Sequence, residues 1–256
     1  MSKQRFFAAM QAFGWHFFGS VVIACVAAAM VFGLLYPTPY AQMLGGFELF
    51  LLVMGVDVVC GPLLTLVLFN PSKPKRELML DLATVMCLQL AALVYGLHTV
   101  WMARPVYLAY ELDRFRVISS ADLGSSDISE IPSQISPPNW GGPSVIGVRI
   151  AEPSDADYLD EIQSSLNGQD AAFRPDRWIP YSEFRAALLA RSHPLSHLHD
   201  KHPEAQELIG TAVSKTGLAP ELLKWLPVQS RRGTGWTVLL NAQNAAVVGW
   251  VQLDGF

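Results

Sequence analysis

Residues 47–69 read FELFLLVMGVDVVCGPLLTLVLF, and this stretch decides the fold class. It is apolar throughout except for Glu48 at its edge and Asp57 inside it. A helix needs roughly 20 apolar residues to cross about 30 Å of hydrocarbon, and two further runs of the chain meet that requirement. We therefore predict three transmembrane helices, near residues 13–35, 47–69 and 79–102. Buried helices of a soluble protein are the alternative, but three such runs so close together argue against it.

The charged residues of this 256-residue chain are unevenly distributed. They make up 16% of the whole, against about 25% in an ordinary soluble domain. Residues 1–104 hold 10 of them, whereas residues 105–256 hold 30. We therefore predict a three-span anchor over residues 1–104 and a soluble domain over residues 105–256. The net charge of −4 leaves no basic surplus to attract nucleic acid, so none is expected as a partner.

The orientation in the bilayer follows from the basic residues of the anchor. These lie before the first span and between the second and third, at Lys3, Arg5, Lys73, Lys75 and Arg76. The other connection, residues 36–46, has none. Because Lys and Arg collect on the cytoplasmic side, we predict a cytoplasmic N-terminus and a soluble domain on the far side.

The three cysteines lie within the predicted spans, at Cys25, Cys60 and Cys87. The exported domain therefore has no disulfide framework. Cys25 also ends a short lipoprotein-like motif, but cleavage there would leave an apolar stretch through Leu35 still to be buried. An uncleaved first span is the simpler interpretation.

The soluble domain shows strand and helix patterns in succession, which predicts an α+β fold. The expected strands are 106–112 and 115–118 about a turn at Asp113-Arg114, then 145–150, 236–240 and 245–252, with 227–231 as an optional addition. The expected helices lie near 154–166, 182–191 and 203–216, and a long loop rich in Ser, Pro and Gly covers 125–143.

Several short motifs together give the chain a family resemblance. They are Gly45–Phe50, Gly55–Leu66, Asp81-Leu82, Leu88–Gly96, Arg104–Val106 and Asp113–Phe115. With these motifs the chain resembles the type IV pilin accessory protein family (TfpX/TfpZ-like). The likeness is densest over residues 36–122 and weaker beyond them.

The resemblance implies a protein of the bacterial inner membrane whose exported domain is periplasmic. Its partners would be the lipid bilayer and a cognate major type IV pilin, which it would support, chaperone-like, in stability or in assembly into pili. The resemblance implies no catalytic activity and no cofactor. The alternative from another class is a membrane sensor or proton-coupled component with Asp57 as the titrating intramembrane group.

Asp57 is the leading candidate site residue because an ionised carboxylate in the middle of a span is costly. Gln89 lies at a similar depth in the third span and can hydrogen-bond it. Gly61 and Pro62 follow one turn later, where proline frees a carbonyl and loosens or kinks the helix. Two interpretations stay open: a polar, deformable site that receives another transmembrane helix, or an Asp–Gln bond that locks the bundle, worth about 0.6 kcal/mol.

Two further features of the anchor are candidates. Ser20, Ala24 and Ala28 form a face of small residues that permits close helix approach, either within this protein or against a pilin helix. Arg104 marks the membrane exit as an interfacial anchor reaching lipid headgroups, and Pro105 ends the helix.

The sequence gives little support for an enzymatic function. An intramembrane aspartyl peptidase needs two adjacent carboxylates, but Asp57 and Asp81 differ in depth by about 15 Å. A histidine run offers the only metal-like pattern, at His193, His197, His199 and His202, and Pro194 and Pro203 interrupt it. We therefore expect no metal site there, but a solvated turn that leads into a helix at Pro203.

Overall fold

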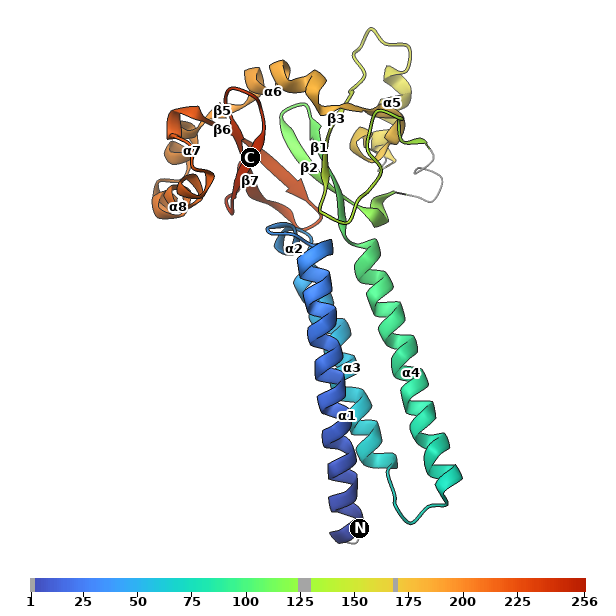
Figure 1. Cartoon of the computed structure of the whole chain (residues 1–256). Coiled ribbons are helices and arrows are strands. Elements are labelled where there is room, and N and C mark those ends of the chain that lie inside the picture. The colour runs from blue at the N-terminus through green and yellow to red at the C-terminus, as the bar shows by residue number, and fades with distance from the viewer. Residues whose placement is uncertain (1–2, 124–129, 168–169) are drawn as a thin grey trace. The chain divides into compact units, whose positions relative to one another are not determined.

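The computed structural model describes residues 3–123, 130–167 and 170–256 (Figure 1). The chain divides into two compact units, Met1–Ala103 and Arg104–Phe256. Each is described by itself below. The predicted class, a three-helix transmembrane bundle followed by an α+β domain, is confirmed.

The first unit consists of helices. α1 (Lys3–Met30) continues into a π-helical turn, η1 (Val31–Leu35), and is followed by the short α2 (Tyr40–Met43). α3 (Gly46–Leu68) and α4 (Lys75–Met102) complete the unit. The helix ending at Leu35, α3 and α4 are each long and apolar enough to cross a membrane. α1 and α4 begin earlier than the predicted spans because good helix formers such as Lys, Arg and Gln continue the helix beyond its apolar part.

α3 is the central helix of this unit, and both α1 and α4 pack along it. Ala27 and Val31 of α1 share a buried cluster with Phe50 and Met54 of α3. α4 approaches α3 closely at Gly96, where any Cβ would overlap the Val53 side chain.

α1 and α4 share no extended contact in the described part of the unit, and they lie apart over much of their length (Figure 1). Near one end, the hydroxyl of Tyr36, which follows η1, donates to the Val100 carbonyl of α4 over 2.9 Å. The Tyr36 ring is buried beside Gly46. The bundle is therefore closed at the Tyr36 end and open along one side.

The second unit is built on a mixed sheet. Over the described residues its strand order is β4-β3-β1-β2-β6-β7-β8, and β5 pairs with β6. The strands are β1 (Pro105–Glu111), β2 (Arg114–Ser119), β3 (Ser144–Val148), β4 (Trp178–Pro180), β5 (His193–Pro194), β6 (Leu223–Ser230), β7 (Gly233–Asn241) and β8 (Val247–Val251). β1 pairs antiparallel with β2 and parallel with β3, and β2 runs parallel to β6.

The α-helices of this unit are α5 (Tyr158–Leu166), α6 (Arg185–Arg191), α7 (Leu195–Lys201) and α8 (Gln206–Thr216). α5, α6 and α8 each begin a few residues later than predicted. Short 3-10 turns precede α6 and α8. α7 was not predicted, because Pro194 and Pro203 bracket it and suggested a turn. Burial of Leu195 and Leu198 stabilises this short helix.

Two strand predictions need correction. The β1–β2 turn is formed by Leu112 and Asp113, with Leu112 in the left-handed region at φ 56°, and Arg114 already belongs to β2. The optional strand at 227–231 is part of β6, which begins at Leu223 and carries Pro227 inside it. Of the predicted loop 125–143, residues 125–129 lie outside the described residues.

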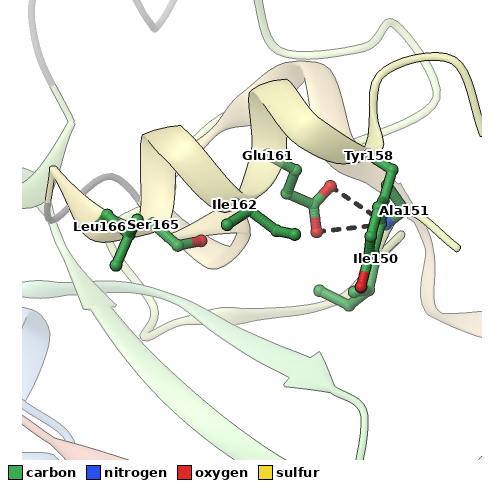
Figure 2. Close-up of a pocket in the computed structure, with 7 residues that line it drawn as sticks. All are labelled: Ile150, Ala151, Tyr158, Glu161, Ile162, Ser165 and Leu166. Atoms are coloured by element: carbon green, nitrogen blue, oxygen red, sulfur yellow. Dashed lines mark hydrogen bonds between the residues drawn. The ribbon is translucent and has the colours of Figure 1, made fainter. Parts of the chain in front are cut away.

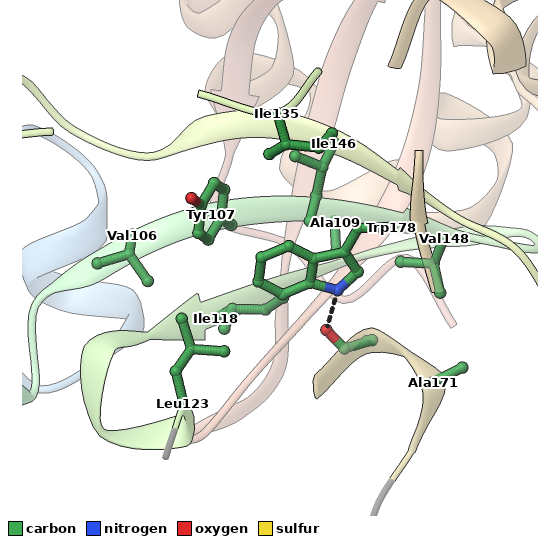
Figure 3. Close-up of a cluster of buried hydrophobic side chains, with 11 residues drawn as sticks. Val106, Tyr107, Ala109, Ile118, Leu123, Ile135, Ile146, Val148, Ala171 and Trp178 are labelled. Atoms are coloured by element: carbon green, nitrogen blue, oxygen red, sulfur yellow. Dashed lines mark hydrogen bonds between the residues drawn. The ribbon is translucent and has the colours of Figure 1, made fainter. Parts of the chain in front are cut away.

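The main core of the second unit surrounds Trp178 (Figure 3). Its ring packs on Tyr107 with centroids 4.6 Å apart, and its indole N–H donates to the Ala172 carbonyl over 3.0 Å. A second cluster, which includes Leu198, Ile209 and Leu239, holds α7 and α8 against β6 and β7.

Candidate functional site

The middle of α3 carries a buried carboxylate. Asp57 lies eleven residues from each end of the helix and is 7% exposed. From α4, Gln89 Nε2 donates to the Asp57 main-chain carbonyl over 3.1 Å and to Asp57 Oδ1 over 3.4 Å. The structure thus places these two predicted site residues together.

Gly61 makes this contact sterically possible. A Cβ at Gly61 would overlap the Gln89 side-chain amide, so only glycine lets the amide lie against α3. The sequence suggested Gly61 and Pro62 as a helix kink. In the structure α3 continues through Pro62 to Leu68. The role that the geometry shows for Gly61 is to make room for Gln89.

α1 adds a polar side chain that the sequence pattern did not single out, His16. His16 Nδ1 lies 2.6 Å from Thr65 Oγ1 of α3, and Ser20, one turn further along α1, is buried. His16 stands out in a 42-residue stretch, Phe6–Phe47, that has no Asp, Glu, Lys or Arg. It was overlooked because neutral histidine is not counted among charged residues.

These side chains border a cavity of about 370 Å³, called here the α1–α4 groove. Its lining residues are Trp15, His16, Gly19, Ser20 and Ile23 of α1, Asp57 of α3, and Met86, Gln89, Leu90 and Leu93 of α4. The groove is mostly apolar, with its polar groups gathered around Asp57 and Gln89. This combination is typical of a binding site that recognises an apolar molecule with a few polar contacts.

The face of small residues on α1 is used within this unit. Ala24 and Ala28 pack against the cluster that contains Phe50 and Met54, while Ser20 borders the α1–α4 groove. The side chains on this face are small because α1 lies close to α3 there.

The predicted membrane exit begins the second unit. The Arg104 carbonyl accepts a hydrogen bond from the Ser120 N–H over 2.9 Å, and Pro105 is the first residue of β1. The sequence suggested that Arg104 extends to lipid headgroups, but its side chain is buried.

The four histidines of the predicted metal-like run do not converge. His193 packs on Trp225 with centroids 4.9 Å apart and lies 6.0 Å from the His197 ring. His199 contacts Gln206, and His202 contacts the Asp254 carbonyl and the Glu204 carboxylate. No cluster of three or more metal-binding side chains occurs in residues 3–123, 130–167 and 170–256.

The second unit has a cavity of its own, of about 330 Å³, between α5 and residues 150–151 (Figure 2). Both carboxylate oxygens of Glu161 accept the Ala151 N–H, at 3.2 and 3.1 Å. Arg177, only 5% exposed, reaches Asp157 at 2.5 Å and Glu161 at 3.5 Å. The Glu161 carboxylate at this cavity is thus paired within the unit, and its contacts fasten α5 to residue 151 and to Arg177.

Taken together, these features define a three-span membrane protein with an α+β domain and a partly polar groove among its spans. The chain is similar in sequence to fimbrial assembly proteins of Dichelobacter nodosus. The serogroup I protein is 33% identical over 257 residues, covering 100% of this chain and 99% of its own length. The protein of serogroups C1 and C2 is 42% identical over 123 residues, which is 48% of this chain and 94% of that relative.

The chain belongs to the fimbrial assembly protein family. The family model described as Fimbrial assembly protein FimB matches residues 4–45, which hold α1, η1 and α2. This is a family of assembly factors rather than enzymes. The resemblance seen in the motifs is thereby confirmed at the level of a pilus assembly family. No solved structure matches the chain.

Proposed function

We propose that this protein is an inner-membrane accessory factor of the TfpX/TfpZ-like kind that binds a cognate type IV major pilin before the pilin enters the fibre. Its family supports the pilus part of this proposal. The observation that supports binding of a pilin is the α1–α4 groove, which lies open among the spanning helices.

The open side of the bundle suits a fourth helix. α1 and α4 both pack on α3 but diverge from each other, so a membrane-embedded helix can lie between them. Spanning helices associate through close packing and interhelical hydrogen bonds, and the groove offers both kinds of contact. We therefore assign the groove to the apolar helix of a pilin subunit.

The distribution of basic residues supports the remaining part of the proposal. Lys3 and Arg5 precede α1, and Lys73, Lys75 and Arg76 lie at the α3–α4 connection. The positive-inside rule then puts the second unit in the periplasm. There it would contact the exported part of the same pilin subunit while the groove holds the helix.

Gly19 provides the sharpest test, because it lines the groove and a Cβ there would meet no atom within 4 Å. Gly19→Leu should therefore fill the groove without disturbing the fold. We expect it to lower pilin capture about tenfold, as overpacking costs roughly 1–3 kcal/mol. Capture is measured in cells by photocrosslinking from position 90, and surface piliation is scored alongside.

Gly14→Leu is the matched control. Gly14 lies on the same helix with equally open space around it, but it does not line the groove. Its variant should capture pilin as the unsubstituted protein does. Equal pilin capture and piliation in both leucine variants would contradict the assignment of the groove.

The alternative of a proton-coupled sensor draws on one observation: a carboxylate, Asp57, and an imidazole, His16, border the same intramembrane groove. Asp57→Asn separates the two functions. A lost response to pH or membrane potential with pilin capture intact would favour the sensor.

A further inference from the structure

Two hydrogen-bond acceptor groups near the middle of the α1–α4 groove, Gln89 Oε1 and the Asp57 carboxylate, lack a close donor. The Gln89 side-chain amide directs its N–H group to Asp57, which leaves Gln89 Oε1 buried and without a partner. Among the described residues, Gln89 Nε2 is the one donor that reaches the Asp57 carboxylate, at 3.4 Å. That distance is beyond the 2.7–3.2 Å of a good N–H···O bond. Two acceptor groups at the same depth are thus left under-satisfied.

The surrounding medium makes this deficit significant. Hydrocarbon contains no water to donate hydrogen bonds, so a buried acceptor without a partner is costly there. A lipid acyl chain has neither N–H nor O–H and cannot satisfy it. A helix that brings an N–H or O–H donor to this depth can.

The depth of the acceptors specifies where that donor must lie. Asp57 is at the midpoint of α3, and Gln89 is within one residue of the midpoint of α4. Gly61 keeps the Gln89 amide at this level, because any larger residue would displace it. The donor is therefore expected near the centre of the incoming helix.

We infer that the α1–α4 groove selects a transmembrane helix carrying a hydrogen-bond donor near its midpoint, with Asp57 and Gln89 as the specificity-determining residues and Gly61 as a positioning residue. This rests on the proposed function, since it refines which helix the groove accepts.

The test uses the full chain in phosphatidylcholine vesicles with a photoreactive residue in place of Leu90, which lines the groove and is 52% exposed. The probes are model Leu/Ala transmembrane helices at low density with a central Asn or a central Leu. Asn is preferred to Thr because a helical Thr hydroxyl often bonds its own chain, as Thr84 and Thr99 do here over 2.9 Å. We expect about threefold greater crosslinking of the Asn helix, the factor typical of one hydrogen bond between spanning helices.

Variants of the groove identify the cause of that preference. The double variant Asp57→Leu with Gln89→Met removes both acceptor groups and should abolish the threefold preference. Gly61→Ala displaces Gln89 and should reduce it, whereas Gly55→Ala, where a Cβ meets nothing within 4 Å, should leave it unchanged. Moving the Asn seven residues toward one end shifts it by about 10 Å and should also remove the preference.

The outcomes separate this inference from the proposed function. Equal capture of the Asn and Leu helices, both lowered by Gly19→Leu, would overturn the inference and leave the groove as a helix site. An Asn preference that persists in the double variant, which lacks both acceptor groups, would also overturn it. Crosslinks to lipid alone would overturn it and would count against the proposed function as well.

Discussion

The two units of this protein differ in how their buried charged side chains are paired. In the second unit, the buried guanidinium of Arg177 pairs with two carboxylates, Asp157 at 2.5 Å and Glu161 at 3.5 Å. In the first unit, the one donor to the Asp57 carboxylate among the described residues is the Gln89 amide, at 3.4 Å. Breaking a buried ion pair destabilises a fold strongly, so paired buried charges are structural. A carboxylate without a close donor inside a spanning bundle is costly, and a further hydrogen-bond partner would lower that cost. This difference is the reason why the proposed function assigns recognition to the anchor and a structural role to the paired charges of the second unit.

The largest expected effect tests the structural side of this comparison. Arg177→Met leaves Glu161 and Asp157 without their common guanidinium inside the second unit. Removing one partner of a buried ion pair is strongly destabilising, so we expect the free energy of unfolding to fall by about 3 kcal/mol. The measurement is urea unfolding of the full chain in mild detergent, followed by near-ultraviolet circular dichroism.

Arg174→Met is the control for that variant. Arg174 pairs with Asp176 at 2.9 Å, but both side chains are partly exposed, at 27% and 47%. An exposed pair contributes about 1 kcal/mol at most. If both arginine variants unfold at the same urea concentration, Arg177 does not hold the unit together as the contacts indicate.

A smaller effect is expected in the anchor. Asp57→Asn preserves the shape of the side chain and a polar partner for Gln89, so the bundle should lose about 0.6 kcal/mol or less. Far-ultraviolet circular dichroism during an SDS titration measures the loss of helix. A destabilisation as large as that of Arg177→Met would mean that Asp57 is a structural charge, and the contrast between the two units would disappear.

The fold class could be predicted because its signals are local. Apolar length identifies a span, and runs of β-branched and aromatic residues on both sides of a turn identify β1 and β2. Local signals failed where burial outweighs them: α7 forms between Pro194 and Pro203 because Leu195 and Leu198 find a core. Pro227 likewise sits inside β6, although proline usually argues against a strand.

The candidate site was predictable only in part. The depth of a residue along a span can be counted, which is why Asp57 and Gln89 could be matched. Which face of a helix turns inward depends on packing, so the approach of His16 to Thr65 and the opening between α1 and α4 were not apparent. The close contact of Gly61 with Gln89 was not apparent either, because the two residues are 28 positions apart in the sequence.

The smallest expected effect is on the pH dependence of the free energy of unfolding. It is tested at two carboxylates of the second unit, Glu111 and Asp157. Burial raises the pKa of Glu111, and the nearby Arg116 opposes this only in part. The folded state therefore holds the Glu111 proton more tightly than the unfolded chain does. The resulting stabilisation is present below the unfolded pKa of about 4.3 and is lost as pH rises through the folded pKa. Glu111→Gln, which mimics the protonated form, should be slightly more stable than the unsubstituted protein at pH 7, with the gain shrinking toward pH 4.

Asp157 should behave in the opposite way. Burial acts to raise its pKa, but the hydrogen bond and charge of Arg177 outweigh this and hold the pKa of Asp157 below its usual value. Its stabilisation is present above the unfolded pKa and is lost as pH falls through the folded pKa. Asp157→Asn should thus be less stable than the unsubstituted protein at pH 7, and the difference should fade in acid. Urea midpoints from about pH 2 to pH 8 measure both variants, because the loss at Asp157 falls below its unfolded pKa. Curves that run parallel to that of the unsubstituted protein over this whole range would show that neither carboxylate is coupled to folding as its surroundings indicate.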